Sequence, residues 1–207
     1  MNKMISVIII DDHPLVLNGF EFILNNTSEI LLKGAFTSAE DALDFLVTEA
    51  VDIVLVDINM PGMNGIDTTA IIKKDYPNTK VIAISNLNEG SIVLRMLQAG
   101  ALGYLLKNVS ADELISSIHA VDEGKQVLSR EMEFMTKSNP CDSIPKVTER
   151  EREVLKLMAQ GLTTPKIADL MFISPLTVES HRRNLLQKFE VSNAVSLIHK
   201  ATEMKFI

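Results

Sequence analysis

The chain has 207 residues and a formal net charge of -7, from 20 Lys and Arg against 27 Asp and Glu. Its length suits two compact domains of ordinary size, and its 46% hydrophobic and 23% charged residues exclude a largely disordered chain. The single cysteine, Cys141, excludes an intramolecular disulfide and a cysteine-based zinc site, and it fits the reducing cytoplasm. No apolar run approaches the roughly 18 residues that a membrane span needs.

The acidic charge is unevenly distributed along the chain. Residues 1–125 contain 8 Lys and Arg against 17 Asp and Glu, a net charge of -9. Residues 126–207 contain 12 Lys and Arg against 10 Asp and Glu, a net charge of +2. The DNA backbone is negative, so the net charge of -9 argues against DNA binding by residues 1–125. The net charge of +2 leaves DNA binding open for residues 126–207.

The amino-terminal part alternates between two patterns. Continuous β-branched runs are typical of strands buried on both faces of a parallel sheet, and they occur at 4–10, 30–36, 53–56, 80–84 and 102–106. Between and after these runs, apolar residues recur at helical spacing, as in Leu17, Phe20 and Leu24. Five strands alternating with five helices predict a doubly wound, flavodoxin-like α/β domain, to which we assign residues 1–124.

Polar residues follow the predicted strands at their carboxyl ends, where ligands bind in such sheets. The first strand ends in Asp11-Asp12, the third in Asp57 and the fourth in Ser85, and the fifth runs into Lys107. Carboxylates a few ångströms apart repel one another, and Mg²⁺ relieves this because it prefers carboxylate, water and phosphate oxygens. Lys107 and Ser85 would then contact a phosphate. The alternative, that these side chains only cap the following helices, does not account for four such strand ends together.

The joint spacing of these residues resembles the receiver domain of bacterial two-component response regulators. The resemblance rests on Ser85 and on the segments DDHP at 11–14, DINMPGMNG at 57–65 and YLLK at 104–107. It implies that Asp57 accepts a phosphoryl group from a sensor histidine kinase, that Lys107 contacts this group and that Ser85 moves towards it. It also implies that Tyr104 turns inward on activation. The implied Mg²⁺ ligands are Asp11, Asp12, Asp57 and the backbone carbonyl oxygen of Asn59.

Two alternatives come from other classes of protein. An aspartyl-phosphate hydrolase would carry a carboxylic acid two residues after the acceptor, where this chain has Asn59. A regulator whose receiver is only a protein-docking surface remains open, because Asn86 stands beside Ser85 where a small residue is expected. We therefore predict no enzyme activity beyond Mg²⁺-dependent self-phosphorylation from a donor and slow self-dephosphorylation.

Regular patterns end after residue 124. Residues 129–137 favour a short helix and 138–145 are rich in turn-forming residues, so we interpret 125–145 as a linker. Thr148 and Glu151 then have the spacing of a capping box, which predicts the start of a new helix.

Two further helices, one starting near Pro165 and one at Ser174-Pro175, are joined by a tight turn. This arrangement predicts a helix-turn-helix, although a generic three-helix bundle fits the apolar spacing equally well. The motifs TEREREVL at 148–155, KIA at 166–168, TVESHRRN at 177–184 and QKF at 187–189 resemble the LuxR-type DNA-binding domain. With the receiver, the whole chain resembles a NarL/FixJ-type response regulator, whose all-α second domain would cover 146–207.

This second resemblance implies that the helix at 175–189 enters the major groove of double-stranded DNA. Glu179, Ser180 and Arg183 would face the bases, although a lysine often stands at the first of these positions. A carboxylate there would accept a hydrogen bond from cytosine or repel the backbone. The candidate phosphate contacts are Lys166, Thr177, Arg182 and Lys188.

The last predicted helix, at 192–205, serves dimerisation in that family. Residues 146–207 carry 10 Lys and Arg against 7 Asp and Glu, a net charge of only +3, so a monomer should bind DNA modestly. We therefore predict a cytoplasmic transcriptional regulator without a membrane partner. Phosphorylation by its kinase would make it a homodimer and promote promoter binding.

Overall fold

The computed structural model describes residues 4–86, 90–128 and 144–207. The chain divides into two compact units, Met1–Pro140 and Cys141–Ile207. The helix predicted at 129–137 and the lone Cys141 lie outside the described residues. Among the residues that are described, no helix is both long and apolar enough to cross a membrane.

The first unit is built on a parallel five-stranded sheet in the order β2-β1-β3-β4-β5. Every residue of β1 and β3 is buried, because these central strands have helices on both faces. The order confirms the doubly wound, flavodoxin-like prediction. The strands β1 to β5 are Ile5–Ile10, Ile30–Phe36, Ile53–Asp57, Lys80–Ser85 and Gly103–Leu106.

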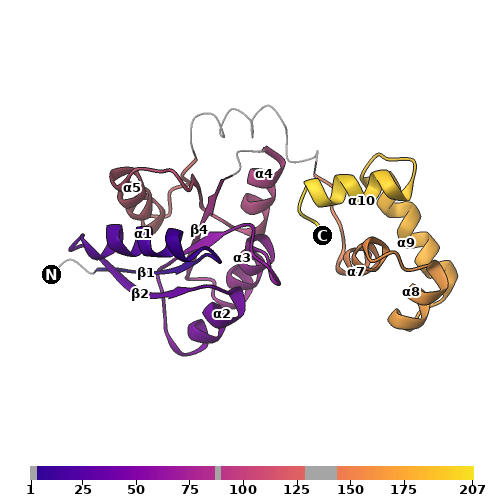
Figure 1. Cartoon of the computed structure of the whole chain (residues 1–207), viewed down its shortest axis with the longest axis horizontal. Helices are drawn as coiled ribbons and strands as arrows, with labels where there is room; N and C mark the ends of the chain where they lie inside the picture. The colour runs from indigo at the N-terminus through magenta and orange to yellow at the C-terminus, as the bar shows by residue number, and fades with distance from the viewer. Residues whose placement is uncertain (1–3, 87–89, 129–143) are drawn as a thin grey trace. The chain divides into compact units, whose positions relative to one another are not determined.

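Helices cover the two faces of the sheet, as Figure 1 shows. One apolar core lies under α1 (Pro14–Asn25) and α5 (Ala111–Asp122). The other core lies under α2 (Ala39–Thr48), α3 (Gly65–Asp75) and α4 (Gly90–Ala99). Because side chains alternate along each strand, the same buried strands supply both cores and hold their carboxyl ends in fixed register.

A short segment after α5 extends the sheet at its edge. The N–H of Val127 donates to the carbonyl of Leu102 at 2.8 Å, and the N–H of Tyr104 donates to the carbonyl of Val127 at 2.9 Å. Val127 thereby forms a parallel bridge with Gly103 on the outer side of β5. The first residues of the segment that the sequence assigns to a linker are thus part of the sheet.

The second unit is entirely helical, with α7 (Glu149–Ala159), α8 (Thr164–Met171), α9 (Pro175–Lys188) and α10 (Ala194–Glu203). The predicted capping box is present at the start of α7. Phe172 adopts a left-handed conformation, with φ 55°, in the turn between α8 and α9. Each of the four helices buries apolar residues, and the ring centroids of the buried Phe189 and Phe206 lie 5.1 Å apart in an edge-to-face arrangement.

Candidate functional site

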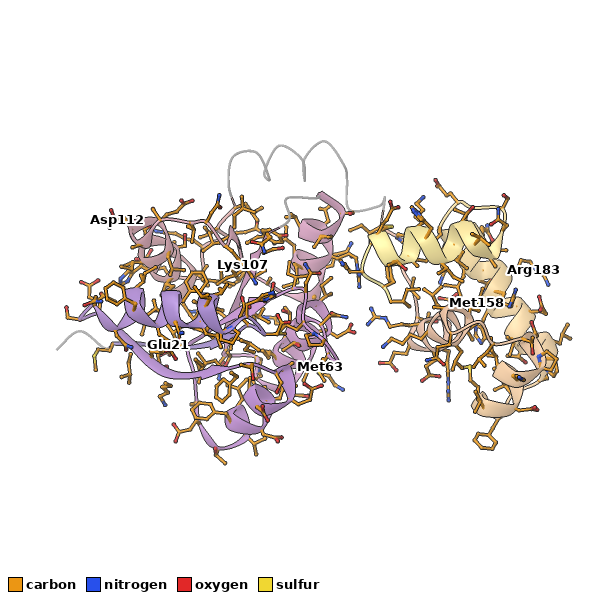
Figure 2. All side chains as sticks on the ribbon, in the orientation of Figure 1. Glu21, Met63, Lys107, Asp112, Met158 and Arg183 are labelled. Carbon is orange, nitrogen blue, oxygen red and sulfur yellow. The ribbon has the colours of Figure 1, made fainter. Side chains whose placement is uncertain are left out.

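Three charged side chains are buried where β1, β3 and β5 end. Asp11 and Asp57 are each 2% exposed and the Lys107 side chain is 7% exposed. Lys107 Nζ lies 2.7 Å from Asp11 Oδ2 and 2.9 Å from Asp57 Oδ2, so one ammonium bridges two carboxylates. Figure 2 labels Lys107 among the side chains of the first unit. The sequence placed these residues at one sheet edge, and the structure brings them into contact.

Burial and charge act in opposite directions on these groups. Burial raises the pKa of Asp57 above its ordinary value, and the neighbouring Asp11 adds to the rise. The hydrogen bond and charge of Lys107 oppose this rise without cancelling it. For Lys107, burial acts to lower the pKa, but hydrogen bonds to Asp11 and Asp57 outweigh burial and raise the pKa. A further cation bound beside Asp57 would therefore favour the ionised form of its carboxyl group.

The loop after β3 approaches Asp57 closely. The backbone N–H of Asn59 donates to Asp57 Oδ1 at 3.3 Å, and Gly65 N–H donates to the carbonyl of Ile58 at 3.1 Å. A Cβ on Gly65 would lie 2.1 Å from the Asp57 carbonyl oxygen, so only glycine allows α3 to begin at this distance. Asn64 accepts hydrogen bonds from two backbone N–H groups of α3 and fixes the other end of the loop.

Ser85 and Tyr104 lie in the strands beside Asp57. Ser85 ends β4, is fully buried, and accepts a hydrogen bond at its carbonyl oxygen from Lys107 N–H at 2.9 Å. Tyr104 is also fully buried, so its ring already lies inward in this structure. Asn86, directly after Ser85, is exposed at the protein surface.

Four side chains at this sheet edge offer ligand atoms within 4.8 Å of one another, namely Asp11, Asp12, His13 and Asp57. An octahedral ion with bonds of about 2.1 Å has ligands about 3 to 4.2 Å apart, a range that lies inside the 4.8 Å within which these atoms gather. Mg²⁺ is usually bound by one or two carboxylates together with waters and phosphate oxygens, and Asp11, Asp12 and Asp57 supply carboxylates for such a set. His13 Nδ1 lies 2.8 Å from Asp12 Oδ1. The sequence motif contained His13, but nothing in its spacing distinguished it as a partner of the carboxylates.

In the second unit, the predicted base-facing residues lie on the exposed side of α9. Glu179, Ser180 and Arg183 are all exposed, opposite the buried Val178 and Leu185. Figure 2 shows Arg183 on the outer side of α9. Ser180 Oγ donates to the carbonyl of Leu176, one turn earlier on the helix.

The four candidate phosphate contacts have different surroundings. Lys166 is exposed, Thr177 lies at the capped start of α9, and the Arg182 side chain is partly exposed. Lys188 Nζ instead donates to Glu151 Oε2 at 2.6 Å. Glu151 is 3% exposed, and a buried carboxylate needs a cationic partner. Lys188 is that partner and so has a structural role within the unit. The sequence missed this pair, whose members are 37 positions apart.

Comparisons with known proteins agree with this two-part architecture. Residues 7–119 match the response regulator receiver domain family, and residues 145–201 match the family of bacterial regulatory proteins, luxR family. The chain is 30% identical over 204 residues to the response regulator UvrY of Escherichia coli strain K12, covering 96% of this chain and 94% of that protein. It is 35% identical over 197 residues to the transcriptional regulatory protein UhpA of Salmonella typhimurium, covering 95% and 97% respectively.

Solved structures give the same result. A complex of the two-component response regulator RcsB with DNA matches with a TM-score of 0.64 and 25% identity, over 97% of this chain and 98% of that chain. RcsB of Salmonella enterica serovar Typhimurium, bound to promoter rprA with the phosphomimetic BeF₃⁻, matches with a TM-score of 0.64 and 26% identity, over 96% and 98%. Relatives in sequence and in structure thus carry both units in the same order. The chain belongs to the two-component response regulators of the NarL/FixJ type, with a receiver domain followed by a LuxR-type helix-turn-helix domain.

Proposed function

We propose that this response regulator is switched by phosphorylation of Asp57 and that the phosphorylated form dimerises and binds promoter DNA. The observation that carries the proposal is the buried contact of Lys107 with Asp11 and Asp57 at the carboxyl ends of the strands. Phosphoryl transfer to an aspartate needs three components: a carboxylate oxygen, a cation for the phosphoryl oxygens and a set of metal ligands. A sensor histidine kinase is the donor that the receiver family implies.

The transfer would form one bond and break another. An Asp57 carboxylate oxygen attacks the phosphorus, and the P–N bond of the kinase phosphohistidine breaks, with its electron pair remaining on the imidazole. Bound Mg²⁺, held by Asp11, Asp12, Asp57 and the Asn59 carbonyl oxygen, would neutralise charge on the phosphoryl oxygens. Lys107 Nζ, now 2.9 Å from Asp57 Oδ2, would donate to the same oxygens.

The added charge is the proposed signal. A phosphoryl group brings about -1.5 to -2 charges to a buried strand end where Ser85 and Tyr104 lie on adjoining strands. The Tyr104 backbone is hydrogen-bonded to Val127, the start of the segment that leads to the second unit. A shift in Tyr104 would therefore reach that segment directly, and it would change the population of a dimerising form. In that form two copies of α9 would meet two half-sites of promoter DNA in the cytoplasm.

Labelling by a small phosphodonor tests the proposal. With Mg²⁺ and acetyl phosphate, we expect the full chain to gain one hydroxylamine-sensitive phosphoryl group by intact mass spectrometry. Asp57→Asn should gain none, whereas Asp44→Asn, which removes an exposed carboxylate from α2, should be labelled normally. Labelling of the Asp57→Asn variant would refute the site. Absence of labelling in the wild type would favour a receiver that serves only as a docking surface.

A further inference from the structure

One continuous face of α9 is open to solvent. Its exposed residues recur every three or four positions, so they form a stripe along the helix opposite the buried Val178, Leu185 and Phe189. In a helix-turn-helix the amino-terminal part of this helix contacts base edges. The stripe comprises Leu176, Glu179, Ser180, Arg183, Asn184 and Gln187.

Glu179 is the only acidic residue on this stripe, and it is held in place by a neighbouring helix. Thr164 Oγ1, at the start of α8, donates to Glu179 Oε1 at 2.6 Å. Arg182 Nε lies 3.8 Å from the same oxygen. Among the described residues, Oε2 has no hydrogen-bond partner, although the side chain as a whole is 51% exposed. One oxygen therefore fixes the carboxylate and leaves the other free to accept.

A carboxylate on this face has few favourable partners on DNA. Phosphates repel it, and the guanine edge offers only acceptors in the major groove. The donors there are the amino groups of cytosine and adenine, and adenine presents the N7 acceptor beside its amino group. A fixed carboxylate oxygen thus suits the N4 amino group of cytosine best, because this base adds no neighbouring acceptor to repel it.

We propose that Glu179 is a specificity-determining residue that selects cytosine at one position of each half-site, and that Thr164 positions its carboxylate. This inference rests on the proposed binding of promoter DNA and names the base that one contact requires. A good contact of this kind discriminates by about 1–3 kcal/mol, so the wrong base should weaken binding by about 5- to 150-fold.

Selection from a randomised duplex library with the full chain, Mg²⁺ and beryllofluoride tests this contact. The wild type should enrich sites with a cytosine that Glu179→Gln does not retain, while preferences at the other positions persist. The variant should prefer adenine there, because a glutamine amide pairs with N6 and N7 of adenine. Glu149→Gln makes the same charge change on the exposed start of α7 and should select the wild-type site.

Thr164 has its own test because it acts through Glu179. Thr164→Val should reduce the preference for cytosine several-fold without changing the preference at other positions. Thr164→Ser keeps the hydroxyl group and should retain the wild-type preference for cytosine. A general weakening at every position would indicate a structural role and would overturn the assignment of Thr164.

The outcomes separate this inference from the proposed function. If Glu179→Gln selects the same cytosine as the wild type, DNA binding stands and the assignment of Glu179 falls. If the wild type enriches no duplex at all, the proposed DNA binding falls, and the assignment of Glu179 falls with it.

Discussion

The Lys188–Glu151 pair predicts that one basic residue of α9 serves stability rather than DNA affinity. We consider Lys188→Met, which keeps most of the aliphatic stem and removes the ammonium. Glu151 Oε2 would lose its contact at 2.6 Å and keep the N–H and the hydroxyl of Thr148, at 2.8 and 3.0 Å. The carboxylate is 4% exposed in its side chain, so water would replace the lost donor poorly.

The magnitude follows from these contacts. Breaking a fully buried ion pair costs about 3–5 kcal/mol, and a single hydrogen bond to a charged group contributes about 1.5–3 kcal/mol. Lys188 is 33% exposed and Glu151 retains two donors, so we expect a loss of stability in the range for a single hydrogen bond to a charged group, about 2 kcal/mol. In a domain of this size, that lowers Tm by roughly 8–16 °C. Calorimetry of the full chain should show the shift in the transition of the second unit.

The pH dependence provides a second measurement. Burial acts to raise the pKa of Glu151, but its hydrogen bonds to Lys188 and Thr148 outweigh burial and lower this pKa below its ordinary value of 4.5. Ionised Glu151 therefore stabilises the fold above pH 4.5, and this contribution is lost as the pH falls through the lowered pKa. The difference between wild type and Lys188→Met should be full at neutral pH and should shrink in acid.

Lys166→Met is the matched control. Lys166 is exposed on α8, so its loss should change stability by less than about 0.5 kcal/mol. If Lys166 contacts a phosphate, the variant should reduce the salt dependence of DNA binding by about one unit of slope. The reasoning fails if Lys188→Met leaves stability unchanged and reduces this slope instead.

Two further predictions concern the receiver. Gly65→Ala should destabilise it by at least about 2 kcal/mol in denaturant titrations, because a Cβ would lie 2.1 Å from the Asp57 carbonyl oxygen. The control Gly19→Ala in α1 places a Cβ with nothing within 4 Å and should stabilise the receiver by about 0.5–1 kcal/mol. Equal effects of the two substitutions would contradict this reasoning. Because burial raises the pKa of Asp57, its contribution to stability is full below pH 3.8 and is lost as the pH rises through the raised pKa. Asp57→Asn should therefore raise Tm at pH 7 without Mg²⁺. The wild type should gain about 2.7 kcal/mol from Mg²⁺ at a hundred times its dissociation constant, and an equal gain in the variant would exclude Asp57 as a ligand.

The sequence predicted which polar residues of the first unit lie together, because parallel strands align their carboxyl ends. Once the buried runs were assigned, Asp11, Asp57 and Lys107 had to lie at one edge of the sheet. What the sequence could not supply was the position of the Lys107 ammonium between Asp11 and Asp57. That position depends on side-chain rotamers in a closed space, and these leave no periodic pattern.

The second unit shows the opposite balance. The resemblance to the LuxR-type domain predicted that Glu179, Ser180 and Arg183 face the DNA, and all three are exposed on α9. The capping box marked the start of α7. Periodicity gives the face of one helix and not its neighbours. The pairing of Thr164 with Glu179, and that of Glu151 with Lys188, depends on how separate helices cross. The phosphate contact of Lys188 rested on the resemblance alone, and its contact with Glu151 on α7 is found only in the structure.

The bridge between Val127 and β5 bears on how this protein can be divided. β5 is the last strand of the sheet, and Val127 supplies partners to the Leu102 carbonyl and the Tyr104 N–H on its outer side. A fragment ended at residue 124 would leave these two groups unpaired on an open strand. Such open strands add to strands of other molecules, so the shortened receiver would tend to associate for reasons unrelated to signalling. A fragment that includes residues 125–128 retains the natural cover of that edge and is the sounder basis for measuring dimerisation.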